Sequence, residues 1–261
     1  MRLTGLLPLL EALPTMQRQI ENLRSEAGLS VQRYALGAPE AARPAIVAAL
    51  ARHWQGPIVW LTAGPERARA VADELGAWTG APERVVHFPP PEALFYDHTP
   101  WEPETVRQRI ALLSLLAGGD ADLRSLPDLG LGSPLVVAPV WALMVKTLPP
   151  SLLRGSIRGL KVGQFRPLAE LAAAWLRFGY QPVTVVEEPG SFSVHGGIVD
   201  VFPPNLPQPV RIEYFGDEID SLRLFDPATQ RSGASVDTVW VTPASEALMG
   251  QGPRAAASVR Q

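Results

Sequence analysis

The sequence contains no cysteine and only two lysines, Lys146 and Lys161, among its 23 basic residues. The absence of cysteine excludes disulfides, thiolate-ligated zinc, iron–sulfur clusters and thiol nucleophiles. A P-loop ATPase needs a lysine directly after a glycine-rich turn, where it contacts the β- and γ-phosphates. Lys146 has no glycines before it, and Lys161 has no serine or threonine beside it. The sequence therefore predicts that a working ATPase site of this kind is absent.

Long apolar runs and an excess of positive charge are also lacking. No run reaches the roughly 18 apolar residues of a membrane-spanning helix, so we expect a cytoplasmic protein without a membrane partner. The net charge of −3 disfavours a protein that coats nucleic acid. The four histidines are dispersed and show no metal-ligand spacing, so we expect no metal site. The acidic pair Asp217–Glu218 falls at a predicted turn, where exposed acids are ordinary, and we expect no catalytic residue.

The first half of the chain alternates short apolar runs with helical segments. Apolar runs of this length are typical of buried parallel strands, and they occur at 58–62, 85–88 and 135–138. Helical patterns occur at 39–54, 66–78, 104–117 and 140–147. This alternation predicts an α/β domain with a parallel sheet.

After Pro149–Pro150 the pattern changes to a compact α+β unit. Strands are predicted at 157–162 and 183–187, a helix at 167–178, and hairpins at 191–202 and 210–225. We therefore predict a larger domain with a first part at 1–146 and a second part at 205–248. A smaller domain at 147–204 would be inserted between them, and 249–261 would be a disordered tail.

The segment 37–44 has the spacing of a P-loop but not its residues. Gly37 occupies the first glycine position, while Ala42, Arg43 and Pro44 replace the second glycine, the lysine and the hydroxyl residue. Proline also lacks the N–H group that a helix start offers to an anion. Taken alone, the segment is best interpreted as an ordinary helix start.

Basic and aromatic side chains concentrate in residues 151–181, where Glu170 is the single acid. Arginine and aromatic residues are enriched at protein–protein hot spots. Solvated surface and core packing are the alternative explanation, and Trp175 is expected in the core. If this segment does bind a partner, its charge indicates an acidic one.

Two long stretches, 190–204 and 209–232, resemble the UvrB-like N-terminal module of the bacterial transcription-repair coupling factor (Mfd), which is related to UvrB. Shorter matches lie at 88–103, 136–144 and 176–180, so the resemblance covers roughly residues 15–248. It implies a P-loop-like parallel-sheet domain with a degenerate nucleotide site, a small inserted α+β domain and a C-terminal β-hairpin segment. UvrB itself has an intact P-loop and a tyrosine-rich hairpin, and this sequence matches neither.

The resemblance implies a non-catalytic function in nucleotide excision repair. The small domain of this family imitates the surface of UvrB that binds UvrA, and so brings UvrA to a stalled RNA polymerase. Segment 37–44 then becomes a relic P-loop without bound ATP, and we expect no cofactor. The alternatives are an ATP-dependent UvrB-like enzyme half and a damaged-DNA-binding module.

The resemblance also places the partner contacts. His195 and Gln181 stand where the family uses arginines to contact UvrA, and we expect Arg166, Arg177 and Phe178 to be accessory contacts. The full-length family adds an RNA-polymerase-interaction domain and an ATP-dependent translocase on double-stranded DNA. We expect this chain to be the module without that motor, whether as a fragment, a truncation or a stand-alone protein.

Overall fold

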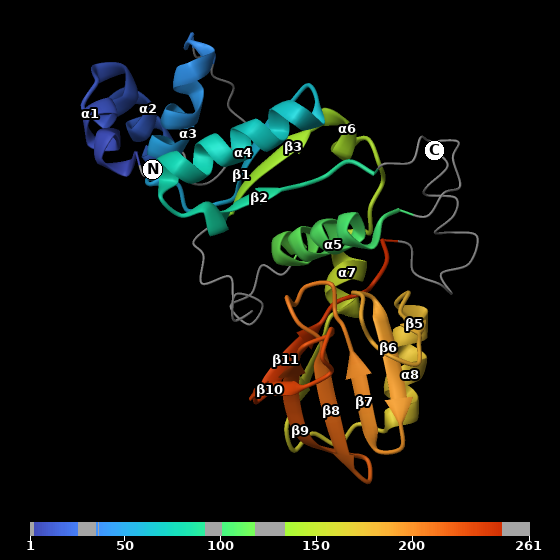
Figure 1. Cartoon of the computed structure of the whole chain (residues 1–261). Helices are drawn as coiled ribbons and strands as arrows, with labels where there is room; N and C mark the ends of the chain where they lie inside the picture. Colours follow the sequence, from blue (N-terminus) through green and yellow to red (C-terminus); the bar gives the residue numbers. More distant parts are fainter. Residues whose placement is uncertain (1–2, 26–34, 36, 92–100, 118–133, 247–261) are drawn as a thin grey trace. The chain divides into compact units, whose positions relative to one another are not determined.

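The computed structural model describes residues 3–25, 35, 37–91, 101–117 and 134–246. The chain divides into two compact units, the first made of residues 1–90 and 129–143 and the second of residues 91–128 and 144–261 (Figure 1). Among the helices described, none is long and apolar enough to cross a membrane. The predicted tail at 249–261 lies outside the described residues.

The first unit contains a small parallel sheet. Its strand order is β1-β3-β2, formed by β1 (Ile58–Thr62), β3 (Leu135–Pro139) and β2 (Val85–His87). Both neighbouring pairs are parallel, as the three apolar runs predicted. The helix α4 (Pro65–Thr79) packs Val71 and Leu75 against Val137 of β3. The mixed α/β class is therefore confirmed for this unit, whereas a P-loop-like architecture stays a prediction.

The first unit contains further helices besides α4. They are η1 (Thr4–Leu6), α1 (Leu7–Glu11), α2 (Pro14–Ser25), η2 (Glu40–Ala42), α3 (Arg43–Ala51), η3 (Pro82–Arg84) and α6 (Val140–Leu143). Leu7 and Met16 from α1 and α2 pack with Ala48 and Ala49 of α3. The predicted helix at 140–147 is shorter than expected, because it ends at Leu143.

The second unit is built on a six-stranded sheet with the order β10-β9-β8-β7-β6-β5. Its strands are β5 (Gln181–Pro182), β6 (Ser191–His195), β7 (Ile198–Val201), β8 (Val210–Phe215), β9 (Glu218–Phe225) and β10 (Ser232–Ser235). β5 is parallel to β6, and the other pairs are antiparallel. Gly196 and Gly216 begin the two hairpin turns with positive φ angles of 62° and 64°, which glycine adopts without steric cost.

One face of this sheet, which we call the inner face, holds the core of the unit. It is covered by the helix α8 (Leu168–Arg177) and by a ribbon of β4 (Arg158–Lys161) paired with β11 (Thr238–Val241). Trp175 of α8 is buried and packs edge-on against Phe192 of β6, with ring centroids 5.5 Å apart. The unit also contains α5 (Pro103–Ala117) and α7 (Pro150–Ser156), which pack together.

Two expectations from the sequence need correction. The β-branched run at 183–187 is not a strand, because pairing with β6 ends after Pro182 and only the Val183 N–H still reaches the Phe192 carbonyl, at 2.9 Å. The residues after 204 do not complete the sheet of the first unit. β8 pairs along its length with β7, so the predicted boundary at Pro204 falls inside one continuous sheet.

Candidate protein-interaction face

The strand register defines which side chains share the outer face of the six-stranded sheet. Residues directly opposite each other in neighbouring strands point to the same side. One such row contains His195, Ile198, Glu213 and Ser221, and the next contains Ser193, Asp200, Arg211 and Arg223. The outer face is therefore rich in polar and charged groups, in contrast to the apolar inner face.

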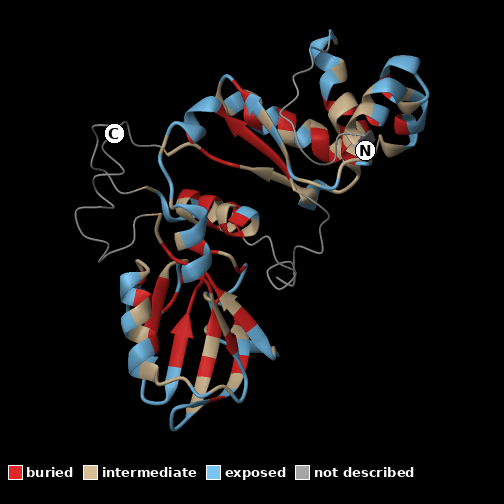
Figure 2. Cartoon of the chain, turned by 180° about the vertical axis from the view of Figure 1, so that it is seen from behind, coloured by how far each residue is buried: buried red, intermediate tan, exposed pale blue. Residues whose placement is uncertain are grey.

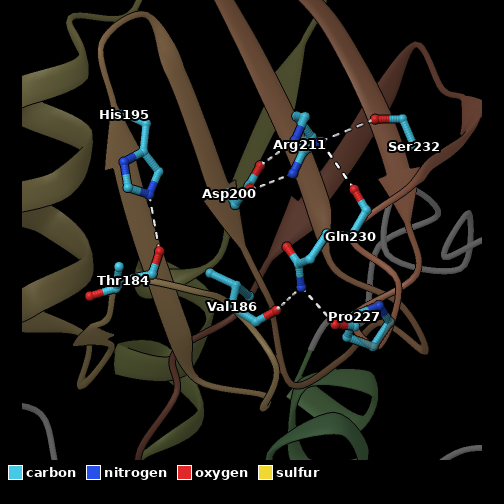
Figure 3. A network of polar contacts seen from close by, with 8 residues as sticks. All are labelled: Thr184, Val186, His195, Asp200, Arg211, Pro227, Gln230 and Ser232. Carbon is cyan, nitrogen blue, oxygen red and sulfur yellow. Dashed lines mark hydrogen bonds and ion pairs between the residues drawn. The ribbon is translucent and has the colours of Figure 1, made fainter.

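Half of the outer face is covered by two irregular segments, 183–190 and 226–231. Val186 of the first segment packs against Phe225 of β9 and Phe202, and all three are buried. The Gln230 side-chain amide links the segments, because it donates to the Val186 carbonyl at 3.2 Å and to the Pro227 carbonyl at 2.6 Å (Figure 3). Among the described residues, Ser193 and Asp200 are buried on this face, whereas His195, Ile198 and Arg223 are exposed, so the hairpin-turn half is the open one.

An ion pair lies at the edge of this cover. The Arg211 guanidinium donates from Nε and Nη2 to the two oxygens of Asp200, each at 2.8 Å. It also stacks over the Phe225 ring, 4.8 Å from its centroid. The hydrogen bond to Asp200 raises the pKa of Arg211, against a lowering by burial. The pair is therefore a fixed, charge-compensated feature of the face rather than two free charges.

His195 lies where the covered half meets the open half. Its Nε2 atom is 3.0 Å from the Thr184 carbonyl oxygen (Figure 3). A carbonyl oxygen can only accept, so Nε2 carries the hydrogen of this bond. The side chain is exposed, as are Ile198 and Arg223 in the neighbouring strands.

The five residues predicted to contact a partner do not form one patch. His195 and Arg166 lie at the hairpin-turn end of the sheet, since the Arg166 N–H donates to the Asp217 carbonyl at 2.8 Å. Gln181 pairs with Ser191, which is four residues, or about 13 Å, away from His195 along β6. Gln181 also lines a cleft of about 290 Å³ together with Trp101 and other residues of the same unit.

Arg177 and Phe178 end α8, on the inner side of the sheet. Arg177 is exposed, whereas Phe178 is half-buried against the core and lies under the Arg158 guanidinium, 5.5 Å from ring centroid to Cζ. The Phe178 carbonyl accepts from the Ala244 N–H at 2.9 Å. Phe178 thus has a packing role within the unit in addition to any contact with a partner.

Two exposed rings, Phe165 and Phe215, were not selected as contacts by sequence reasoning. Both pair with Glu218, next to the β8–β9 turn. Figure 2 shows the hairpin turns of this sheet largely in the pale blue of exposed residues. Phe215 is the last residue of β8, in a segment whose sequence predicts a hairpin. An apolar residue is ordinary in such a strand, so the sequence did not indicate that this ring is exposed. The strand register, together with the bulge between Glu213 and Tyr214, was needed to place it.

The predicted degenerate nucleotide segment forms η2 and the start of α3 in the first unit. Gly37 is exposed, Ala42 is the N-cap of α3 without a side-chain hydrogen bond, and Pro44 is buried in the first turn beside exposed Arg43. The Glu40 carboxylate lies at this helix start, 3.2 Å from Arg67 Nε. Within the described residues, no group of histidine, aspartate and glutamate side chains has the arrangement of a metal site.

Comparison with known proteins places these features in a family. Residues 159–246 match the model of the UvrB interaction domain. The chain is 35% identical over 219 residues to a transcription-repair coupling factor of Myxococcus xanthus, and 31% identical over 222 residues to that of Bacillus subtilis. These alignments cover 82% and 85% of the chain. The factor of Mycobacterium bovis is 34% identical over 260 residues, or 98% of the chain.

The chain therefore belongs to the transcription-repair coupling factor family, as a UvrB-like module. It spans 17%, 18% and 20% of the length of the Myxococcus, Bacillus and Mycobacterium relatives. The family-model match begins in β4 and ends just after β11, so it contains the whole six-stranded sheet and its inner-face cover. The matched region and the second structural unit both include the residues before and after Pro204.

Proposed function

We propose that this chain is a non-catalytic docking module that binds UvrA in transcription-coupled nucleotide excision repair. The observation that carries the proposal is the coincidence of the UvrB interaction domain with a sheet whose outer face is half open. The packing of segments 183–190 and 226–231 over the rest of this face supports the choice of its open half as the contact surface.

The open half carries charges of both signs. Arg223 lies one row further from the hairpin turns than Glu213, which shares its row with His195, and Glu218 lies at the β8–β9 turn. Charge patterns of this kind supply orientation and partner choice more than raw affinity. We propose His195 as the centre of the contact, because its side chain is exposed and is held at the boundary of the cover by its contact with the Thr184 carbonyl.

The remaining predicted contacts flank this centre. Arg166 belongs to the hairpin-turn end, while Arg177, Phe178 and Gln181 belong to the opposite end of the unit. A partner that touched all of them would have to extend along the whole sheet. We therefore propose Arg166 as the nearer accessory contact and test the other three separately.

The same proposal assigns no nucleotide chemistry to the first unit. Pro44 removes an N–H donor from the first turn of α3, so this helix start offers a phosphate one hydrogen bond fewer. In the full-length family context, RNA polymerase and double-stranded DNA would be bound through other segments. The role of this chain would then be recruitment.

The direct test is a titration of purified chain with purified UvrA from the same organism. Wild type should bind, and His195→Glu should weaken binding about tenfold, the effect of a typical hot-spot substitution. Arg166→Glu, Arg177→Glu, Phe178→Ala and Gln181→Glu are measured singly to rank the flanking contacts. Arg69→Glu in α4, an exposed arginine of the first unit, is the charge-reversal control. Failure of folded wild type to bind UvrA would overturn the proposal.

A further inference from the structure

Phe215 and Phe165 are the most solvent-exposed large apolar side chains among the residues described, at 83% and 71%. Both pair with the same residue of β9. Phe215 is opposite Glu218 in the β8–β9 hairpin, and Phe165 forms an isolated antiparallel bridge with Glu218 from the other side. The three side chains therefore form one row on the outer face, with Glu218 between the two rings.

The backbone beneath this row is fixed by hydrogen bonds. The Gly163 N–H donates to the Ile219 carbonyl at 2.8 Å, and the Ile219 N–H donates to the Gln164 carbonyl at 3.0 Å. On the other side, the Tyr214 N–H donates to the Gly197 carbonyl at 2.8 Å. Both rings are thus carried on paired backbone rather than on free loops, which lowers the entropy lost when they are buried by a partner.

Among the residues that the structure describes, none buries either ring. The neighbouring aromatic Tyr214 turns inward and packs against the core, and Phe225 is buried under the cover of the outer face. Burial of these two phenylalanine rings by a partner would be favourable, because it removes apolar surface from water. Exposed rings grouped on a rigid surface are typical of interaction sites.

The charges around the rings indicate the chemistry of the surface they meet. Glu218 lies between them, and Asp217 and Asp220 are exposed beside them in the turn and in β9. Arg166 follows Phe165, but its side chain is half-buried rather than exposed. Burial raises the pKa of the inward-facing Tyr214, and the charge of Arg166 offsets part of that rise. The outer side of this end is therefore acidic around an apolar centre.

We propose that Phe165 and Phe215 are the apolar anchor of the docking face and insert into an apolar socket rimmed by lysine or arginine side chains on UvrA. This inference rests on the proposed function, which supplies the partner. The charge pattern also sets an orientation. The cationic rim of UvrA meets Asp217 and Glu218 at the β8–β9 turn, and its acidic groups meet Arg223, which is exposed further along β9.

The anchor is tested by titrating UvrA with Phe165→Ala, Phe215→Ala and the double variant. Each single substitution should weaken binding about tenfold or more, and Phe215→Leu should restore part of the loss, because an apolar side chain can still fill a socket. Leu9→Ala in α1, at a position 69% exposed, is the matched control and should bind like wild type. Urea midpoints of all variants should stay near that of wild type, since no buried side chain is removed.

The charge of the socket is tested separately with the double substitution Asp217→Asn and Glu218→Gln. This variant should bind UvrA more weakly, and its affinity should depend less steeply on salt than that of wild type. If wild type binds UvrA and the double alanine variant binds equally well, the anchor is overturned while the proposed function stands. If folded wild type does not bind UvrA, both are overturned.

Discussion

The Arg109 guanidinium of α5 forms two hydrogen bonds with the Glu246 carboxylate, Nε to Oε1 at 2.5 Å and Nη2 to Oε2 at 3.1 Å. The side chains are only 0% and 6% exposed. The Trp101 ring also lies against this arginine, with its centroid 5.3 Å from Cζ. This pair joins α5 to the segment that follows β11 within the second unit, across 137 residues of sequence.

Replacing Arg109 by alanine should lower the free energy of unfolding by about 3–5 kcal/mol, because it leaves the Glu246 charge buried without its partner. Arg107→Ala on the same helix is the matched control. Arg107 pairs with Glu104 in a more exposed position, and its loss should cost under about 1 kcal/mol. Urea unfolding measures both, and equal losses would show that the buried pair is not special.

The Asp200–Arg211 pair gives a second stability prediction. Asp200→Asn removes the charge that two guanidinium hydrogen bonds require, and we expect a loss of about 3 kcal/mol in unfolding free energy. Arg211 also donates to the Gln230 carbonyl and to Ser232 Oγ, each at 3.4 Å, so turn 226–231 should become more accessible to protease. The exposed residue Asp237 provides a control, because Asp237→Asn should change stability by less than about 0.5 kcal/mol.

The buried hydroxyl of Tyr214 should make the free energy of unfolding depend on pH in alkaline solution. Burial raises the pKa of its hydroxyl from 10.0 to about 12, with a smaller lowering by Arg166 and a raising by Asp217. The unfolded chain therefore loses this proton at a lower pH than the folded chain does. The stability that the neutral tyrosine contributes is complete below pH 10 and should decline as the pH rises toward about 12.

The measurement is chemical unfolding of wild type and Tyr214→Phe at a series of alkaline pH values. The variant should lose less stability across this window than wild type. Parallel pH dependences in the two proteins would contradict the assignment to Tyr214. Tyr180, whose buried hydroxyl donates to the Thr242 carbonyl at 2.7 Å, remains in both proteins and so cancels in the comparison.

The start of α3 is not expected to bind a nucleotide. Magnesium and ATP together should produce no shift in the thermal unfolding midpoint, because Pro44 offers no N–H and the P-loop lysine and hydroxyl residue are missing at this helix start. A shift that requires magnesium and saturates with ATP would contradict the non-catalytic assignment. It would favour the ATP-dependent enzyme half instead.

Local turn chemistry and apolar runs made much of the fold predictable. Glycine is common where φ must be positive, and Gly196 and Gly216 mark the two hairpin turns where the sequence placed them. The three parallel strands of the first unit were readable as short, unbroken apolar runs. Helix α8 was predicted within one residue at each end.

Tertiary context decided the features that the sequence did not reveal. The run Val183–Val186 has strand propensity, but Val186 is buried by packing on Phe225, and the Thr184 carbonyl accepts from His195 instead of a strand neighbour. The predicted contacts were also close in sequence yet divided in space. Helix α8 alone separates Arg166 from Arg177 by about 15 Å, at the rise of an α-helix. The sequence of one segment does not indicate which face of a sheet that segment will cover in the folded protein.

Competition between this chain and UvrB for UvrA tests the central claim most directly. Labelled UvrB is bound to purified UvrA, and the unlabelled chain is added in increasing amounts. A chain that imitates the UvrB surface should displace labelled UvrB until none remains bound, and the variant His195→Glu should need about ten times more protein to do so. Binding of the chain to UvrA without any displacement of UvrB would contradict the account.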